Sequence, residues 1–544
     1  MSAPSQLRIS GGTVYDPANG VDGEVRDVCI EGERIVAELP SNVPRLDARG
    51  MIVMPGGVDI HAHIAGSSVN QGRRLLPEQH ATDPVPAPRL ADGATARSGT
   101  AGTIPSTFTT GYRYAGLGYT TVMEAAVAPL AARHAHAELD DTPIIDAGCF
   151  VLLGNDEYLL RQLAAGELAR ARQYVAWLLG ATRAYAIKVV NPGGIARWKS
   201  GGTERDVRGI DDPVGSSSVT PRKILEVLAG VANTLELPHP VHIHCNNLGQ
   251  PGNVATTLQT MQALAGQRAH FTHLQFHSYG GERGKGWKSA ARDVIEHVNA
   301  HPEISADVGQ VMFGPATTLT ADAPVEHLLY ASTGRKWVNV DIELETGCGI
   351  VPYAYRQQAA VAALQWAVGL ELFLLARDPW RVVLSTDHPN GGSFLSYPQL
   401  IRLLMDRTYR DEQLKRVNQK LLAGSALLDG LAREYTLSEI AIVTRAGPAR
   451  LLGLKSKGHL GAGADADVTI YKDHPDRAQM FATPRHVIKG GTIVVEEGQL
   501  RRAPPGRRLA VRPEYDAAVT KDLKRFFQDY ACVSFENYGA EPVS

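Results

Sequence analysis

The sequence predicts an α/β fold, a TIM (β/α)8 barrel with a small composite β-sandwich built from both ends of the chain. Three observations carry this prediction. Apolar runs of strand length alternate with helical stretches over residues 56–434, the pattern of βα units. We count eight such runs, the number that closes a barrel. Both flanks contain short alternating runs joined by Gly, Asp and Asn turns, and 544 residues allow more than one domain.

The two flanks are expected to pair into one discontinuous domain, residues 1–55 with 435–505. The first flank contains "LRISGGTVYDP", "VRDVCIEGERIVAEL" and "RLDARGMIVMP". A similar texture returns in "ADADVTIYKDH" and "PRHVIKGGTIVVEEGQL". Alternation of this kind predicts strands with one buried face.

The expected barrel strands follow one another between the flanks. Seven of them are assigned to single runs, and the seventh in order has two candidates, "ISADVGQVMF" and "WVNVDIEL". The assigned runs are "GVDIHAHI", "YTTVMEAA", "PIIDAGCFV", "YAIKVV", "PVHIHC", "AHFTHLQF" and "RVVLSTDH".

Three insertions leave the carboxyl ends of the predicted strands. Residues 65–118 follow strand one, residues 193–221 follow strand four and residues 278–290 follow strand six. Active sites of such barrels lie on this face, so all three insertions are expected beside the site. Five prolines in the first insertion predict little regular structure there.

Residues 506–544 form a predicted helical extension. Its apolar residues recur at helical spacing, as in an amphipathic helix: Tyr515, Val519, Leu523, Phe526, Phe527 and Tyr530. Both packing on its own chain and contact with a partner protein stay open.

Composition excludes several classes of protein. A formal net charge of -2 gives no basic field for nucleic acid, and no apolar run reaches membrane-spanning length. No secretory signal is visible at the N-terminus. The five cysteines are dispersed, which argues against a disulfide scaffold and an iron–sulfur site. We therefore expect a cytoplasmic protein that binds neither nucleic acid nor membrane.

Residue types that bind metal occur at the ends of several predicted strands. His61 and His63 lie two apart on strand one, so their side chains share a face. Alone, this pair could equally be one buried and one exposed histidine. The other strand ends strengthen the metal interpretation, because they carry Lys188, His242 and His244, His273, and Asp387.

Imidazole and carboxylate ligands suit a zinc pair, and two nearby cations also favour a bridging anion. Lys188 could supply one if CO2 converts its amine to a carbamate, since burial favours the neutral amine. An ion-paired lysine at a strand end is the alternative.

This arrangement of H-x-H, Lys, His, His and Asp resembles the amidohydrolase superfamily, and "STDHP" resembles its strand-eight motif. Longer stretches resemble the A subunits of formylmethanofuran dehydrogenase and of the bacterial formyltransferase/hydrolase complex. These stretches are "STFTTGYRYAGLGYTTVMEAA", "HIHCNNLGQPGN", "FTHLQFHSYG" and "LSTDHPNGGSF". The Ala- and Arg-rich composition favours the bacterial branch.

The resemblance implies hydrolysis of an N-formyl amine on a furan cofactor, giving formate and the free amine. It implies one zinc at His61, His63 and Asp387, and a second zinc at His244 and His273. N6-carboxylated Lys188 and a hydroxide would bridge them, with Asp387 as catalytic base and then acid. It also implies partner subunits B, C and D.

A second group of residues is expected to bind the substrate. Asn246 and Asn247 follow the strand-five ligand, although Asn also suits a turn. Cations in the insertions would guide an anionic cofactor tail, with solvated surface charge as the alternative: Arg197, Lys199, Arg283 and Lys285.

Two rival interpretations remain. One is a free-standing cyclic amidohydrolase of the dihydropyrimidinase or hydantoinase type, which the long first insertion and the tail helix disfavour. The other is a non-catalytic barrel scaffold, which the intact ligand set disfavours.

Overall fold

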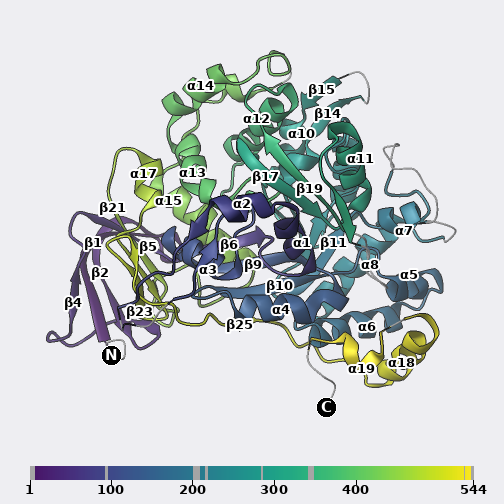
Figure 1. The fold of residues 1–544 in the computed structure, drawn as a ribbon, viewed down its shortest axis with the longest axis horizontal. Helices are drawn as coiled ribbons and strands as arrows, with labels where there is room; N and C mark the ends of the chain where they lie inside the picture. Colours follow the sequence, from purple (N-terminus) through teal and green to yellow (C-terminus); the bar gives the residue numbers. More distant parts are fainter. Residues whose placement is uncertain are drawn as a thin grey trace.

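The computed structural model describes residues 6–91, 93, 96–199, 209–214, 218–282, 286–340, 348–424, 426–531 and 533–540. At its centre lie eight parallel strands in one sheet, in the order β20-β16-β13-β12-β11-β10-β9-β6 (Figure 1). This confirms the predicted TIM-barrel-like α/β fold. The strands are β6 Gly57–Ala62, β9 Tyr119–Val127, β10 Asp146–Leu152, β11 Ala186–Val190, β12 Val241–His244, β13 Ala269–Phe271, β16 Ile304–Asp307 and β20 Val382–Val383.

The two edge strands of this sheet meet just beyond their ends. Ala62 forms a parallel bridge with His388, and the His63 amide donates to the His388 carbonyl at 2.7 Å. The helices that follow the strands are α3 Thr107–Gly116, α4 Ala132–Asp140, α5 Glu157–Ala164, α6 Leu168–Ala181, α8 Pro221–Thr234, α9 Val254–Ala263, α10 Ala291–Ala300, α12 Ala360–Leu375 and α13 Tyr397–Met405. Their buried apolar residues form the main core of the molecule.

Strand seven is β16, within "ISADVGQVMF". The competing run contributes β18 (Val338–Val340), which pairs outside the barrel with β19 (Cys348–Tyr355) and, through it, β17 (Gly314–Thr320). This small sheet and α11 (Ala323–Thr333) form a fourth insertion, after strand seven. Its β-type residues pair locally, which explains why the sequence pattern left two candidates.

The first insertion is more regular than predicted. It contains α1 (Ser67–Leu75), α2 (Pro77–Thr82) and the short strands β7 (Pro84–Val85) and β8 (Gly99–Thr100). Pro77 occupies the first turn of α2, where a missing amide proton breaks no helical hydrogen bond. The prediction of little regular structure was therefore wrong for residues 67–82.

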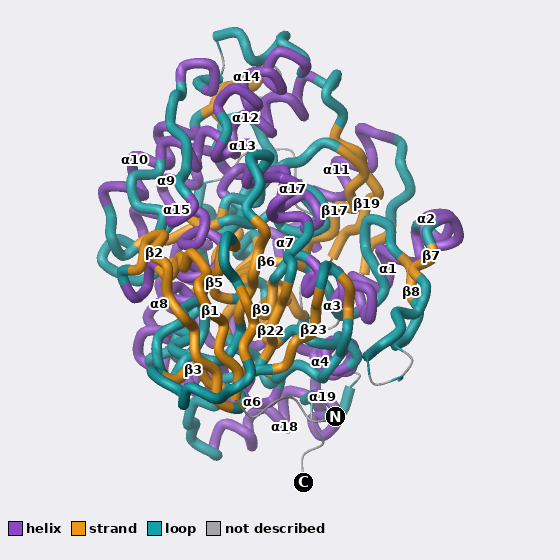
Figure 2. Tube along the Cα trace, turned by 90° about the vertical axis from the view of Figure 1, so that its left-hand side faces the viewer, coloured by secondary structure: helices purple, strands orange, loops and turns teal. Residues whose placement is uncertain are grey.

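The two ends of the chain build a separate nine-stranded sheet. The strands from both ends lie side by side at the left of Figure 1 and face the viewer in Figure 2. The junction is the antiparallel pairing of β5 with β21. The strands are β1 Gln6–Asp16, β2 Val21–Glu31, β3 Arg34–Val36, β4 Arg45–Asp47, β5 Met51–Pro55, β21 Val468–Lys472, β22 His486–Lys489, β23 Thr492–Glu496 and β24 Gln499–Leu500. The exact domain limits stay a prediction.

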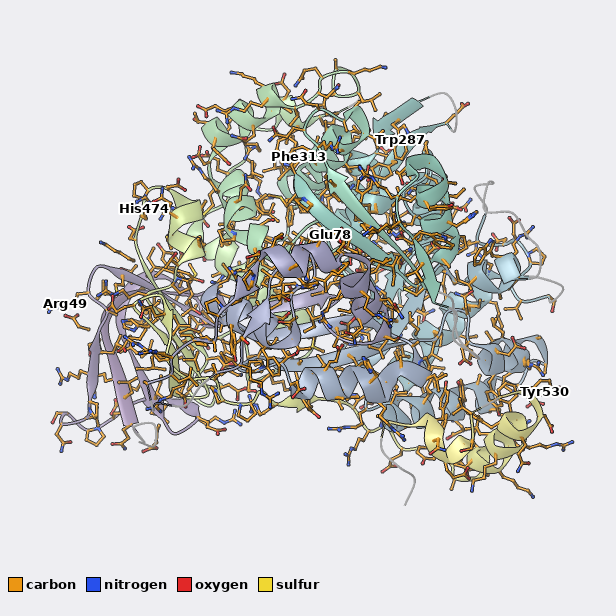
Figure 3. All side chains as sticks on the ribbon, viewed as in Figure 1. Arg49, Glu78, Trp287, Phe313, His474 and Tyr530 are labelled. Carbon is orange, nitrogen blue, oxygen red and sulfur yellow. The ribbon has the colours of Figure 1, made fainter. Side chains whose placement is uncertain are left out.

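The C-terminal segment returns to the barrel. Strand β25 (Arg508–Leu509) pairs in parallel with the start of β10. Helix α18 (Ala518–Tyr530) buries Val519, Leu523, Phe526 and Phe527. The Phe526 ring packs edge-on against Tyr158 of α5, while Tyr530 stays 53% exposed at the helix end (Figure 3). The apolar face is therefore covered by its own chain.

No helix in the described ranges combines the length and the apolar character needed to cross a membrane.

Candidate metal centre

A cavity of about 490 Å³ opens at the carboxyl ends of the barrel strands. Six side chains from five strand ends line it together, the same six that the sequence suggested as metal ligands. They are His61, His63, Lys188, His244, His273 and Asp387. All six are buried, between 0 and 5% exposed, so the structure brings them together in a site largely removed from solvent.

The two histidines of strand one converge on one carboxylate. His61 Nε2 and His63 Nε2 lie 3.0 and 3.1 Å from Asp387 Oδ1. His61 Nε2 nevertheless has no partner in hydrogen-bond geometry. Ligand atoms of these three residues lie within 4.8 Å of one another, so the group could hold a metal ion.

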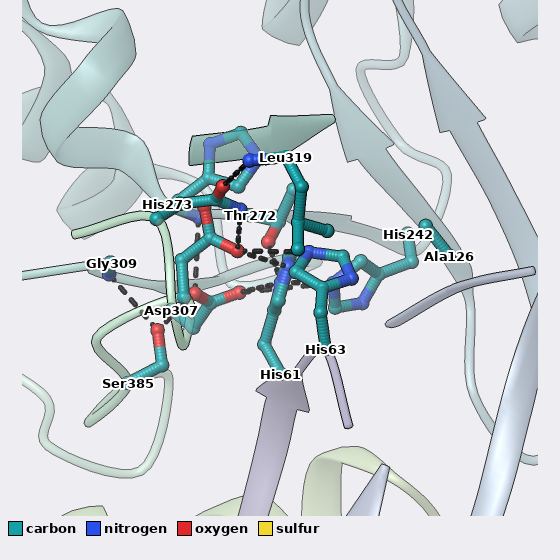
Figure 4. Close-up of polar contacts among 12 residues, drawn as sticks. His61, His63, Ala126, His242, Thr272, His273, Asp307, Gly309, Leu319 and Ser385 are labelled. Atoms are coloured by element: carbon teal, nitrogen blue, oxygen red, sulfur yellow. Dashed lines mark hydrogen bonds and ion pairs between the residues drawn. The ribbon is translucent and has the colours of Figure 1, made fainter. Parts of the chain in front are cut away.

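Two carboxylates that sequence reasoning missed support this pair from behind. Glu124 on β9 lies with Oε1 3.1 Å from His63 Nδ1. Asp307 at the end of β16 lies with Oδ2 3.4 Å from His61 Nδ1, and both of these residues are labelled in Figure 4. A carboxylate behind a metal-binding histidine fixes its ring and tautomer. The signal available in the sequence was an acidic residue within each of two apolar strand runs, "YTTVMEAA" and "ISADVGQVMF".

The second half of the centre comes from strands five and six. His244 ends β12, and His273 follows β13 with φ 37°, a left-handed conformation that is strained for a residue with a Cβ. Gly309 permits this conformation, because a Cβ there would lie 2.3 Å from that of His273. His277, four residues beyond His273, completes a group of three imidazoles that the sequence reasoning overlooked.

Lys188 lies between the two halves. Its ammonium nitrogen is buried without a hydrogen-bond partner. Burial lowers the pKa of Lys188 to about 8, although Asp387, Asp307 and Glu124 act in the opposite direction. A sizeable fraction of neutral amine therefore exists near neutral pH, as carboxylation by CO2 requires.

The charges of His244, His273 and Asp387 suit metal binding. Burial opposes the charge of His63, but Asp387 and Glu124 raise its pKa to about 9, so a bound metal would displace its proton. Burial lowers the pKa values of His244 and His273 well below the usual range, so both imidazoles are neutral ligands. Burial alone would raise the pKa of Asp387, but His61 and His63, which contact its carboxylate, hold it well below its usual value. Asp387 is thus ionised at neutral pH, as a ligand or a general base must be.

The walls of the cavity are largely apolar and come in part from the fourth insertion. Tyr353 and Tyr355 of β19 and Leu329 of α11 line it, together with Phe276 and Trp287. Glu326 of α11 also faces the cavity, and burial raises its pKa well above the usual range. A substrate with a flat apolar group would therefore meet aromatic and aliphatic walls.

The predicted substrate-binding residues lie elsewhere or outside the described ranges. Asn246, Asn247 and Arg197 line a neighbouring cavity of about 70 Å³, which shares Gln250 and Val325 with the larger one. Asn247 adopts a left-handed φ of 64° and donates to Thr256 Oγ1 at 2.8 Å, as in the turn alternative. Lys199 ends the short helix α7 (Gly194–Lys199), but its side chain is not described. Arg283 and Lys285 lie outside the described residues.

The fold and this cluster are typical of a hydrolase of the amidohydrolase type, and comparison with known proteins agrees. The amidohydrolase family model matches residues 46–495, so the chain belongs to that family. It is 43% identical to Protein FwdA of Methanocaldococcus jannaschii over 98% of this chain and 96% of that protein. It is 40% identical to the A subunit of the formyltransferase/hydrolase complex Fhc of Methylorubrum extorquens, over 96% and 94% of the two chains.

A solved structure gives the same result. The crystal structure of the FhcABCD complex from Methylorubrum extorquens with methylofuran contains a chain that matches with a TM-score of 0.91 at 38% identity. The match covers 98% of this chain and 96% of that one. The likeness therefore includes the insertions around the cavity as well as the barrel, and it confirms the resemblance seen in the sequence.

Proposed function

We propose that this protein hydrolyses the N-formyl amine of a formylated furan cofactor, such as formylmethylofuran or formylmethanofuran, to formate and the free amine. The observation that carries the proposal is the match, over nearly the whole chain, to one component of a formyltransferase/hydrolase complex. The six convergent side chains at the cavity floor supply the chemistry that such a reaction needs.

The residues fit a zinc pair. Lys188 Nζ, His61 Nε2, His244 Nε2 and His273 Nδ1 are buried polar atoms without hydrogen-bond partners, an arrangement that buried groups rarely tolerate. His61, His63 and Asp387 would hold one ion, and His244 and His273 the other. N6-carboxylated Lys188 and a hydroxide would bridge them. Bound zinc would acidify the attacking water to a pKa of about 7 and polarise the formyl oxygen.

Asp387 is the proposed proton carrier. Its carboxylate would accept the proton released as water adds to the formyl carbon, and then donate it to the amine nitrogen as the C–N bond breaks. An amine leaves poorly without that proton. Asn390 holds the carboxylate in place, because its Nδ2 donates to Asp387 Oδ1 at 3.0 Å.

Glu124 and Asp307 act as positioning residues in this proposal. Glu124 would accept the Nδ1 proton of His63. Asp307 lies 3.4 Å from His61 Nδ1, which His242 Nε2 approaches at 3.0 Å. These contacts hold the two rings with their Nε2 atoms toward Asp387. The Ile64 and Ala65 amides also donate to Glu124 Oε2, at 2.5 and 2.8 Å, so the carboxylate itself is fixed.

The proposal includes a multi-subunit assembly. The relatives suggest subunits B, C and D as partners, and the composition favours the bacterial hydrolase branch, although FwdA is matched at slightly higher identity. The four described cysteines are free thiols, in keeping with the proposed cytoplasmic location. The cation hypothesis for Arg197, Lys199, Arg283 and Lys285 stays a prediction.

Two measurements test the proposal. The chain is purified from its host, the co-purifying proteins are identified, and formate release from a formylated furan cofactor is assayed before and after chelation. We expect three companion subunits, activity lost on chelation and activity restored by zinc. Formate release that is indifferent to metal removal would refute the mechanism.

The cation hypothesis, that basic side chains bind the anionic tail of the cofactor, has its own assay. Changing Arg283 and Lys285 to alanine should raise KM for the full-length cofactor but not for N-formylfurfurylamine. An equal effect on the two substrates would remove the hypothesis without touching the proposed chemistry.

A further inference from the structure

His277 has no assigned role, yet its surroundings are unusual. The side chain is fully buried, and neither ring nitrogen has a hydrogen-bond partner. Among the buried histidines of the described ranges, it alone leaves both ring nitrogens buried in this way. A buried polar group without a partner costs stability, so the unpartnered ring of His277 indicates that it binds a ligand.

Other buried histidines beneath the site, to which the proposed function assigns no metal, have hydrogen-bond partners. His239 Nε2 lies 3.0 Å from His242 Nδ1, and His242 Nε2 lies 3.0 Å from His61 Nδ1. His270 Nδ1 lies 2.9 Å from Ser305 Oγ. These rings are joined in hydrogen-bonded chains, whereas His277 is not.

The neighbours of His277 are the two proposed ligands of the second zinc. The ring centroids lie 4.7 Å apart for His244 and His273, 5.1 Å for His244 and His277, and 5.2 Å for His273 and His277. One nitrogen from each ring lies within 4.8 Å of the others. Zinc about 2.1 Å from three imidazole nitrogens separates them by about 3.5 Å, which falls inside this limit.

The backbone holds His277 in this position. It ends the short 3-10 helix η3 (Leu274–His277), which begins directly after His273. Thr257 Oγ1 donates to the His277 carbonyl at 2.9 Å, and Asn253 Nδ2 donates to the Phe276 carbonyl at 2.8 Å. Helix α9 and its N-cap residue Asn253 therefore fix the turn that presents the ring, as a preorganised site requires.

We propose that His277 is a third imidazole ligand of the second metal, beside His244 and His273. The inference rests on the zinc pair of the proposed function and adds a residue to it. With carboxylated Lys188 as the bridging group, the second metal would have four protein ligands, and the first would keep His61, His63 and Asp387.

Zinc content tests the proposal without using activity. The full chain is equilibrated with a zinc buffer at which the wild type holds two ions. The variant His277→Gln keeps the size and hydrogen-bonding ability of the side chain but is a poor zinc ligand. We expect a fall toward one zinc per chain, through at least a tenfold loss of affinity at the second site.

The control variant is His136→Gln. His136 is also buried, but its Nε2 lies 2.9 Å from the Thr182 carbonyl oxygen, away from the metal centre. The His136→Gln variant should keep two zinc ions per chain. If His277→Gln also keeps two with unchanged affinity, His277 is not a ligand, and the proposed function is unaffected. A wild-type chain that binds no zinc would overturn both.

A crystal structure of the zinc-loaded wild type gives a second readout that does not depend on any variant folding. Anomalous scattering at the zinc edge locates both ions. We expect a His277 nitrogen about 2.1 Å from the second ion. A distance beyond about 3 Å, with His244 and His273 bound, would overturn the inference.

Discussion

Two buried clusters of charged residues lie at opposite ends of the barrel, and they differ in whether their lysines have polar partners. At the carboxyl ends of the strands, Lys188 has no hydrogen-bond partner. At the other end, Lys457 lies 2.6 Å from Asp146, at the start of β10, and 2.8 Å from Asp467, before β21. Lys489 lies 2.7 and 2.9 Å from the same two carboxylates.

The pKa values of Lys188 and Lys457 are therefore shifted in opposite directions. Burial lowers the pKa of Lys188 to about 8. Burial also opposes the charge of Lys457, but Asp467, Asp146 and Asp465 raise its pKa above the usual value. The three aspartates of this second cluster are close enough to hold a metal, yet lysines already neutralise them. Of these two clusters, the one whose lysine is unsatisfied is the proposed metal centre, and the one whose lysines are satisfied is a structural contact between barrel and composite sheet.

The largest expected effect comes from Lys188→Met. Formate release should fall by about 1,000-fold or more, because the bridge between the proposed metal ions is lost. The free energy of unfolding of the zinc-free protein should change little, since the amine has no partner to lose. If the variant keeps activity within tenfold of the wild type, Lys188 is not needed for the reaction, and the two clusters do not differ in the way proposed.

The opposite pattern is expected for Lys457→Met. Loss of the ammonium leaves Asp146 and Asp467 less well neutralised, which should lower the free energy of unfolding by about 3–5 kcal/mol in denaturant titrations. Zinc content should stay unchanged. The exposed Lys472→Met is the matched control, expected within about 0.5 kcal/mol of the wild type. Zinc lost from Lys457→Met would contradict a purely structural role.

A smaller effect is expected for Glu124→Gln. The neutral amide supports the His63 ring less well, so zinc affinity should fall by about 10- to 100-fold. Competition with a chelator measures it. Glu157→Gln, on the surface of α5, should leave the affinity unchanged. Equal affinities for the two variants would show that the carboxylate behind His63 does not tune the site.

The smallest effect is a pH dependence of stability. Burial opposes ionisation of Asp146, but Lys489 and Lys457 lower its pKa to about 2. Its folded pKa is thus below the unfolded value of about 3.9, so its stabilisation is complete above about pH 4 and is lost as pH falls toward 2. Unfolding titrations across this range should show a steeper slope for the wild type than for Lys457→Met. Parallel slopes would rule out this cluster as the cause.

Much of the barrel and the six convergent side chains were predictable, because strand ends can be counted along the sequence. His61, Lys188 and Asp387 each follow an apolar run, and parallel strands bring such ends to one face. The supporting groups were not predictable in this way. Glu124 and Asp307 act through contacts between strands distant in sequence.

Local conformation explains the other misses. His277 joins the centre only because a 3-10 turn follows His273, and periodicity does not predict such a turn. Strand seven stayed ambiguous because the run around Val338–Val340 has the same β-type composition and pairs in a sheet of its own. Asn246 and Asn247 follow the strand-five histidine, but they line the smaller neighbouring cavity, so their role in substrate binding stays a prediction.

The pairing of β5 with β21 has a consequence for biosynthesis. The first five strands of the composite sheet leave the ribosome before the barrel is made, whereas their partners emerge after it. The early strands therefore expose an unpaired edge for most of translation, a form prone to association. Lys457 and Lys489 can contact Asp146 only after the late strands have been made. The complete sheet and this ion-pair contact would therefore form only in chains that have been translated through β22.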